Sequence, residues 1–427
     1  MNDQQHRMSR DRFIALARGS ADLAAIDGLV AAQSSKHMIL VSAIAAMARE
    51  EGGLGDGIAL EGSRLLAQVQ DRARTAAEEV ISHPSVGMWA LQTLRGGGAA
   101  PGARPSGLAG VAAAAAIKAG TDSEIEVPVI NGSVTLPSLG VATAEGDTAI
   151  VRTAAAQIRS GGLVVEARPG QPGWRELRRV RMGDHSVLID DLDPFRLSAP
   201  ECDRTSRLEA SQLADFSAML GSAWSVLSAA SAAEISAIVR VIVPFLAPRT
   251  GYVSTSSALA FGTVGMSRQP DPYTCAETLV HETQHLKLSA LLDLVVLTQP
   301  DDGRRYYAPW RVDPRPASGL LQGAYAFFGV SGFWREQRAL APESQVRQRA
   351  EGEFARWRDG AARVAETLLS CGQLTAAGTV FVAEMADVLN AWCREPVDPE
   401  ALAAARLEAE RHRARWRSDH GDPDQPQ

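Results

Sequence analysis

The 427-residue chain has few cysteines, and they follow no metal-binding or disulfide pattern. The four cysteines, Cys202, Cys275, Cys371 and Cys393, lie far apart and form no C-x-x-C pair. This arrangement argues against a disulfide framework and against a structural zinc or iron–sulfur site. Cys275 lies shortly before the most informative motif of the chain, and we expect it to be a buried, inert thiol.

The sequence also lacks an excess of basic residues and a long apolar run. It has 43 lysines and arginines against 50 aspartates and glutamates, which gives a net charge of -7. An acidic chain without a basic cluster indicates no nucleic-acid partner. The polar N-terminus has no signal-peptide core, and no segment stands out as long enough to cross a bilayer. We therefore predict a cytoplasmic protein without a membrane partner.

At this length more than one subdomain is expected. We predict an α+β protein, mainly helical, with a small central antiparallel sheet and a helical metal-binding C-terminal half. The predicted segments are an N-terminal helical region at 1–100, a short helix plus antiparallel β region at 108–200, a helical catalytic region at 201–418 and a frayed tail at 419–427.

Hydrophobic periodicity predicts the individual elements. Helices are expected at 9–49 (two helices), 57–81, 83–94, 108–119, 205–230, 232–246, 271–294, 319–328, 343–371, 374–394 and 398–418. Strands are expected at 125–129, 133–136, 149–151, 163–166, 187–190 and 263–266. The glycine-rich stretch at 96–102 is expected to be a flexible break between the first two regions.

The helix at 271–294 carries the motif H-E-x-x-H as His281, Glu282 and His285. Residues four apart lie on one face of a helix, so the two imidazoles can bind one metal ion. In a zinc peptidase, Glu282 would be the general base for a metal-bound water. The alternative is that the two histidines only pack in the core.

The rest of the sequence fits a zinc peptidase poorly. Leu288 and Leu291 occupy the positions at which the longer H-E-x-x-H-x-x-G-x-x-H motif has glycine and the third histidine. No glutamate occurs between Glu282 and Glu336 to supply the third ligand from a following helix. Asp301 and Asp302 are weaker candidates for that ligand, and Asp293 lies too far along the helix.

The following helix offers Gln322, whose amide oxygen is a candidate third ligand. The connecting loop supplies Arg311 and Arg315, whose guanidinium groups suit a carboxylate, although pairing with Asp313 is the alternative. Two histidines, one further ligand and nearby arginines are what a non-haem Fe(II), 2-oxoacid-dependent oxygenase needs. Elsewhere, His83 is a candidate for a distant ligand or for packing, and the acidic residues at 190–193 for a cation site or a solvated strand end.

These segments together resemble one protein family. The similar stretches are HETQHLKLSALLDL at 281–294, YAPWR at 307–311 with Arg315-Pro316, the segment 319–330, MSRDRF at 8–13, HPSVGMW at 83–89, DDLDP at 190–194 and STSSALAFG at 254–262. They resemble the 2-oxoglutarate-dependent HExxH-type peptide β-hydroxylases that mature ribosomally made peptide natural products. The chain corresponds to a standalone member without a radical SAM domain, and it departs from the family pattern at Gln322, where many members have histidine.

The resemblance implies a function and a set of partners. It implies Fe(II) and 2-oxoglutarate as cofactors and hydroxylation at a β-carbon of a residue in a precursor peptide, with other maturation enzymes as associates. His281, His285 and Gln322 would hold the metal, Arg311 or Arg315 would bind 2-oxoglutarate, and Glu282 would orient a ligand. The alternatives are a zinc metallopeptidase and a peptide-binding protein with a degenerate site.

Overall fold

The computed structural model describes residues 6–50, 57–96, 101–197, 205–341 and 343–422. In this part of the chain the protein is α+β and mainly helical, as predicted, with thirteen helices and twelve strands. Some predictions concern residues outside this described part. They are the predictions for Cys202, for the start of the N-terminus, for the centre of the 96–102 break and for the end of the tail.

The chain divides into two compact units, and both are discontinuous in sequence. Unit 1 comprises Met1–Val30, Met219–Ile238 and Pro270–Gln427, and unit 2 comprises Ala31–Ala218 and Val239–Gln269. The predicted regions 1–100 and 201–418 therefore each supply residues to both units. Two helices, α2 (Leu23–Glu50) and α7 (Ala210–Trp224), run from one unit into the other.

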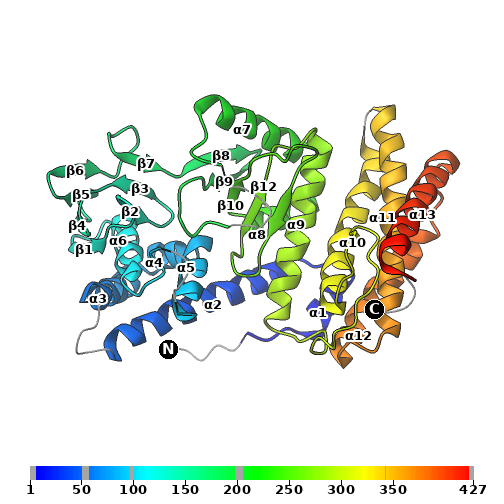
Figure 1. Cartoon of the computed structure of the whole chain (residues 1–427), viewed down its shortest axis with the longest axis horizontal. Helices are drawn as coiled ribbons and strands as arrows, with labels where there is room; N and C mark the ends of the chain where they lie inside the picture. The colour runs from blue at the N-terminus through cyan, green and yellow to red at the C-terminus, as the bar shows by residue number, and fades with distance from the viewer. Residues whose placement is uncertain (1–5, 51–56, 97–100, 198–204, 342, 423–427) are drawn as a thin grey trace. The chain divides into compact units, whose positions relative to one another are not determined.

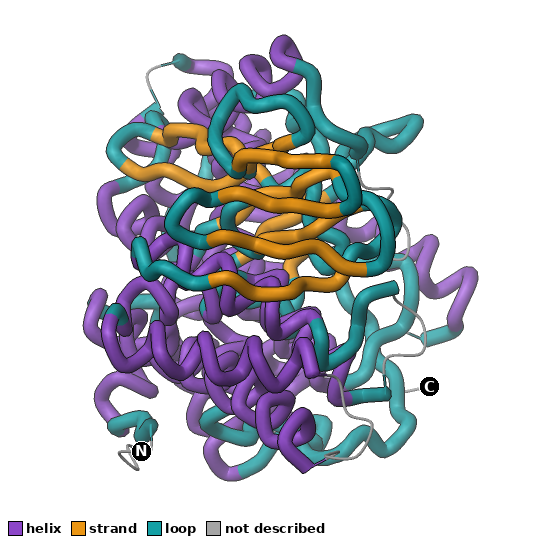
Figure 2. The backbone as a smooth tube through the Cα atoms, turned by 90° about the vertical axis from the view of Figure 1, so that its left-hand side faces the viewer, coloured by secondary structure: helices purple, strands orange, loops and turns teal. Residues whose placement is uncertain are grey.

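Unit 2 contains the described strands, which form three sheets rather than the one predicted (Figure 2). An antiparallel sheet of four strands has the order β1 (Glu124–Pro128), β4 (Thr148–Arg152), β5 (Gln157–Ser160), β6 (Leu163–Glu166). A second, of three strands, has the order β2 (Ser133–Leu136), β3 (Gly140–Thr143), β7 (Trp174–Glu176). The third has the order β11 (Ser254–Ser256), β12 (Thr263–Met266), β10 (Val241–Pro244), β9 (His185–Ile189), β8 (Arg178–Met182).

The third sheet corrects two predictions. It is mixed, because β10 pairs in parallel with both β9 and β12. The helix predicted at 232–246 is wrong beyond Ile238, where α8 (Ala229–Ile238) ends and β10 follows. All four residues of β10 are buried, and the β-branched run Val241-Ile242-Val243 suits a strand covered on both faces.

The helices of unit 2 are α3 (Gly57–Arg72), α4 (Arg74–Ile81), α5 (Pro84–Leu94) and α6 (Gly107–Ala119). The single helix predicted at 57–81 is thus two, because the backbone leaves helical geometry at Ala73 (φ −145°). Helix α6 carries an uninterrupted buried run from Leu108 to Ala116. It lies against α3, where a Cβ on Gly62 would lie 2.7 Å from the Ala109 nitrogen, so the small residues set this close approach.

Helix α2 corrects the expectation about apolar segments. Its Leu23–Arg49 portion spans 27 residues with a hydropathy of 1.3, and by length and composition it could cross a membrane. Ile26, Leu29, Val41 and Ile44 of this helix are buried in the structure. An apolar helix that packs inside a protein meets the same criteria, so a cytoplasmic location remains a prediction.

Unit 1 is helical. It contains α1 (Arg10–Ala17), α8, α9 (Pro272–Leu292), α10 (Ala317–Leu340), α11 (Ser344–Ser370), α12 (Ala376–Cys393) and α13 (Pro399–His420). Helix α10 packs against α9 and α11, and α11 packs against α12 and α13 (Figure 1). The small residues of α10 permit this packing, as predicted: a Cβ on Gly329 would lie 2.4 Å from the Gln284 side chain of α9.

Candidate functional site

The H-E-x-x-H helix begins where the sequence predicted. The Asp271 carboxylate accepts hydrogen bonds from the backbone N–H groups of Tyr273 and Thr274, both at 2.9 Å, and Pro272 occupies the first helical position. Both features favour a helix start. The helix then continues through the motif to Leu292, with most of its residues buried. His281 and His285 are therefore carried by one rigid, well-packed element.

The two histidines of the motif face one another. Their Nε2 atoms lie 3.1 Å apart, and the rings meet edge to face with centroids 4.7 Å apart. Two imidazole nitrogens at this separation suit adjacent positions around one metal ion with bonds of about 2.1 Å. A hydrogen bond between the rings also fits the distance. Among the described residues, no third histidine, cysteine, aspartate or glutamate joins the pair in a group that could hold a metal ion, so metal binding by His281 and His285 stays a prediction.

Gln322 of α10 lies on the other side of the His285 ring. Its Oε1 atom is 3.1 Å from Nδ1 of His285, and its amide nitrogen is 3.4 Å from Oγ of Ser289. The amide oxygen can only accept, so it pairs with the His285 tautomer that carries its proton on Nδ1. In that tautomer the Nε2 lone pair faces Nε2 of His281, where it can accept a hydrogen bond or bind a metal. Direct ligation by Gln322 stays a prediction, since the observed contact is that of a residue orienting a ligand.

An aromatic wall covers His281. The Phe327 ring meets His281 edge-on with centroids 4.9 Å apart. Trp310 and Trp357 pack against Phe327 with centroid distances of 4.7 and 4.2 Å. Burial lowers the pKa of His281 well below its ordinary value, and the neighbouring His285 lowers it further. His281 is therefore neutral at physiological pH, which is the form that binds metals.

Glu282, the central residue of the motif, is buried with 3% of its surface exposed. It follows His281 directly on the helix. Its carboxylate would be the general base in a zinc hydrolase and would orient a ligand in an oxygenase. That role stays a prediction until the general-base and orienting alternatives are separated by substitution.

Sequence analysis missed two carboxyl groups in this region, Glu277 and Glu353. Glu277 lies one turn before His281 on α9, and Glu353 lies on α11. Burial, followed by the nearby Glu353 carboxyl, raises the pKa of Glu277 to about 8, while Arg349 opposes the shift. Burial also raises the pKa of Glu353. The spacing of four residues from His281 was the available sequence signal for Glu277; nothing in the sequence pairs it with Glu353.

The raised pKa of Glu277 leads to a prediction about stability. Because the folded protein holds a proton that the unfolded chain releases near pH 4.5, stability should fall as the pH rises from there through about 8. Glu277→Gln stays neutral throughout. The melting temperatures of the variant and the wild type are measured at pH 5, 7 and 8.5. As the pH rises across this range, the melting temperature of the variant should increase by about 3–6 °C relative to that of the wild type.

Glu410→Gln, which changes an exposed carboxylate of α13, is the control and should follow the wild-type curve. Parallel pH profiles for Glu277→Gln and the wild type would show that Glu277 is already ionised at low pH, contrary to this assignment.

The two arginines predicted to bind 2-oxoglutarate lie in the loop between α9 and α10. Arg311 and Arg315 form ion pairs with the same carboxylate, Asp313, at 2.8 and 3.0 Å. Their side chains are 51% and 38% exposed. An exposed pair of this kind contributes only about 0–1 kcal/mol, so a ligand carboxylate could replace Asp313 at little cost. Their role in binding 2-oxoglutarate stays a prediction.

Other candidate ligands have different roles. Asp293 is the exposed C-cap residue of α9. Asp301 and Asp302 form ion pairs with Arg305 and Arg304. Cys275 is buried, as predicted, and burial raises the pKa of its thiol to about 12, which disfavours the reactive thiolate.

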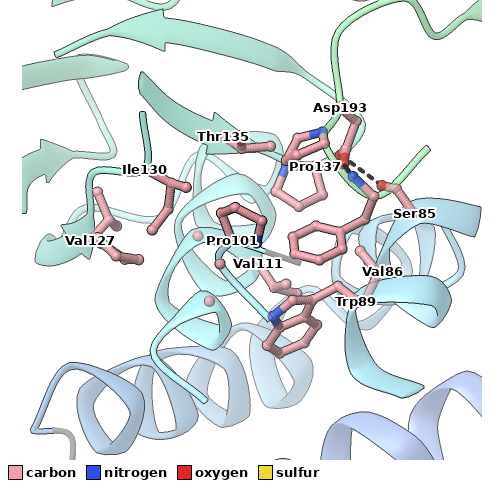
Figure 3. A pocket seen from close by; sticks show the side chains of 16 residues that line it. Ser85, Val86, Trp89, Pro101, Val111, Val127, Ile130, Thr135, Pro137 and Asp193 are labelled. Atoms are coloured by element: carbon pink, nitrogen blue, oxygen red, sulfur yellow. Dashed lines mark hydrogen bonds between the residues drawn. The ribbon is translucent and has the colours of Figure 1, made fainter. Parts of the chain in front are cut away.

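In unit 2, the structure joins two motifs that lie far apart in the sequence. Nδ1 of His83 and Oγ of Ser85 lie 2.8 Å apart. Ser85 in turn donates to the Asp193 carboxylate at 2.8 Å, as Figure 3 shows. Burial lowers the pKa of His83 to about 3, so it is neutral. The adjoining cavity of about 60 Å³ is far smaller than ligand pockets of roughly 300–1,000 Å³. We therefore read this chain of contacts as packing, which was one of the two predictions for His83.

The neighbouring Asp191 also has a structural role. It forms ion pairs with Arg178 and Arg207, and its side chain is fully buried. The strand end at 190–193 is thus tied into the protein, so the prediction of a solvated strand end is wrong for these aspartates. The buried side chains bind neighbouring backbone and arginine groups instead.

No protein-family model matches the chain, and no curated protein is significantly similar to it in sequence. The family resemblance seen in the motifs therefore remains a prediction that must be tested by experiment.

Proposed function

We propose that the protein is a non-haem Fe(II), 2-oxoglutarate-dependent oxygenase that hydroxylates a β-carbon of a residue in a ribosomally made peptide. The observation that carries the proposal is the 3.1 Å separation of the two Nε2 atoms on α9. The neutral state of His281 and the contact between Gln322 and Nδ1 of His285 support it. The resemblance of the surrounding motifs to peptide β-hydroxylases supplies the substrate class.

In this proposal each residue of the site has a defined task. His281 and His285 hold Fe(II), and Gln322 holds the His285 ring in the tautomer that presents Nε2. Phe327 and the two tryptophans beside it exclude water from one side of the pair. When bound, Fe(II) and 2-oxoglutarate supply the oxidising power for attack on an unactivated C–H bond. Arg311 or Arg315 would give up its ion pair with Asp313 and bind the distal carboxylate of 2-oxoglutarate instead.

The sequence around the motif, and not the observed ligand set, favours an oxygenase over a zinc hydrolase. Catalytic zinc sites generally have three protein ligands. Among the described residues, no group of three or more histidine, cysteine, aspartate or glutamate side chains is arranged to hold a metal. The usual non-haem Fe(II) site also has three protein ligands, two histidines and a carboxylate, so this finding does not separate the two chemistries. What separates them is the sequence around the motif, where Leu288 and Leu291 replace the glycine and third histidine of the longer zinc motif.

Glu282→Gln distinguishes the two chemistries. In a hydrolase the substitution removes the general base and should lower peptide cleavage by about 10²–10⁴-fold. In an oxygenase no step uses this carboxylate as a base, so conversion of 2-oxoglutarate to succinate should decrease but remain measurable. The experiment follows succinate formation and peptide cleavage by the anaerobically Fe(II)-loaded wild type and variant after dioxygen is admitted.

The wild type could instead cleave the peptide without 2-oxoglutarate, and Glu282→Gln could lose this cleavage. That result would show that the protein is a hydrolase and not an oxygenase. Absence of both activities in a protein that retains its metal would favour the peptide-binding alternative.

A further inference from the structure

One loop of unit 1 carries both the arginines that we propose to bind 2-oxoglutarate and part of the aromatic wall beside the histidine pair. We call residues 306–315 the arginine loop. Its two ends are joined by backbone hydrogen bonds of 2.8 and 2.9 Å between Tyr306 and Arg315. Within the loop, the Trp310 ring stacks on Phe327 with centroids 4.7 Å apart. The conformation of this loop therefore sets where the arginines lie relative to the histidine pair.

Helices α10 and α11 hold the first half of the arginine loop. A Cβ on Gly323 of α10 would lie 2.4 Å from the indole nitrogen of Trp310, so the glycine is what admits this ring. Pro309 lies beside Gly360 of α11. These contacts end at Trp310, and the residues that follow it are held from a different helix.

Helix α13 contacts the loop through His412. Nδ1 of this ring is 2.9 Å from the Tyr307 hydroxyl, and the backbone of Arg311 is a further hydrogen-bond partner of the imidazole. Burial lowers the pKa of His412, so the ring is neutral at physiological pH and can accept the hydroxyl proton at Nδ1. One imidazole thus joins two separate positions of the loop.

The next two turns of α13 continue the same face at intervals of four residues. Trp416 is buried, and its ring meets that of Tyr307 edge to face with centroids 5.3 Å apart. Nε2 of His420 donates to the backbone carbonyl of Val312 at 2.8 Å. The helix therefore holds the loop backbone at Val312 as well as at Arg311.

These backbone contacts do not depend on the arginine side chains. Arg311 and Arg315 both pair with Asp313, at 2.8 and 3.0 Å, and both side chains are partly exposed. A guanidinium that leaves Asp313 for a ligand carboxylate no longer ties the loop together through that pair. The contacts of α13 with the backbone of Arg311 and Val312 would persist through this exchange.

We propose that α13 positions the arginine loop to bind the distal carboxylate of 2-oxoglutarate, with His412 as the positioning residue. The inference rests on the proposed function, which supplies the ligand. A loop without this anchor has more conformations, and ordering it at the moment of binding lowers the affinity. Because the contacts of His412 are with the loop, retention of Fe(II) should not change.

The test measures 2-oxoglutarate affinity of the anaerobic, Fe(II)-loaded whole chain by calorimetry. It also measures hydrogen–deuterium exchange of the amides at 311–313 in the metal-free chain. His412→Ala should weaken 2-oxoglutarate binding by about tenfold and speed this exchange, since it removes an anchor of about one to two hydrogen bonds. The KM for 2-oxoglutarate should rise with little change in kcat. His412→Gln, which keeps a donor and an acceptor, should recover most of the affinity.

Two further variants make the result specific. Tyr307→Phe removes only the hydroxyl that contacts His412 and should reproduce part of the loss while keeping the ring packed on Trp416. His185→Ala is the matched control, because it removes an imidazole that is bonded to the Val239 carbonyl in unit 2. It should bind 2-oxoglutarate like the wild type. Thermal melting confirms that each variant folds.

The outcomes separate this proposal from the proposed function. If the wild type binds 2-oxoglutarate but His412→Ala and Tyr307→Phe bind it equally well, α13 does not position the arginines and only this proposal fails. A loss of affinity that His185→Ala shares would also overturn it. If the wild type itself binds no 2-oxoglutarate, the proposed function fails and the positioning role fails with it.

Discussion

Replacing either His281 or His285 by alanine should abolish both metal retention and succinate formation. Each substitution removes one of the two imidazoles whose Nε2 atoms lie 3.1 Å apart, and the remaining donor chelates too weakly to keep an ion in place. The measurement is the Fe(II) content of anaerobically reconstituted, desalted protein, together with the succinate formed per molecule. The wild type should retain about one equivalent.

Two further variants make this experiment specific. His420→Ala removes an imidazole at the end of α13 and should leave metal retention unchanged. Gln322→Leu removes the oxygen that accepts from Nδ1 of His285 and should weaken metal affinity by about 10–100-fold. Full metal retention in both alanine variants of the motif would show that His281 and His285 form only a hydrogen-bonded pair.

The second large effect concerns a buried ion pair between α9 and α8. The Lys287 ammonium lies 3.0 Å from both carboxylate oxygens of Glu234 on α8, and only 1% of its side chain is exposed. Glu234→Leu would leave this charge buried without its partner, which typically costs about 3–5 kcal/mol. We expect the free energy of unfolding, measured in urea, to fall by about this amount.

The double variant Lys287→Met/Glu234→Leu removes both charges while keeping similar bulk. It should recover most of the lost stability, because apolar replacement of a whole buried pair is often neutral or stabilising. Asp301→Leu, which disrupts an exposed pair with Arg305, should change stability little. If the single and double variants were equally destabilised, lost packing rather than the unpaired charge would be the cause.

Several features of the fold were predictable because their causes lie close together in the sequence. Asp271 and Pro272 start α9 through hydrogen bonds and backbone angles that involve only the next few residues. The alternation of apolar and polar residues located β1, β2, β4, β6 and β9, and β12 was predicted as a strand without such alternation. The spacing of four residues likewise placed His281 and His285 on one helical face, and this geometry needs no distant partner.

The packing of the whole chain determined which of these elements contact one another. The short apolar run at 241–244 resembles a helix continuation in sequence, but parallel pairing with β9 and β12 makes it a strand. The contact of Gln322 with Nδ1 of His285, the approach of Glu353 to Glu277 and the pairing of Lys287 with Glu234 all join residues from different helices. Local sequence determines hydrogen bonding and side-chain direction within one element. The choice of partner depends on how the elements pack, because contacts between distant residues form only when the whole apolar surface is buried.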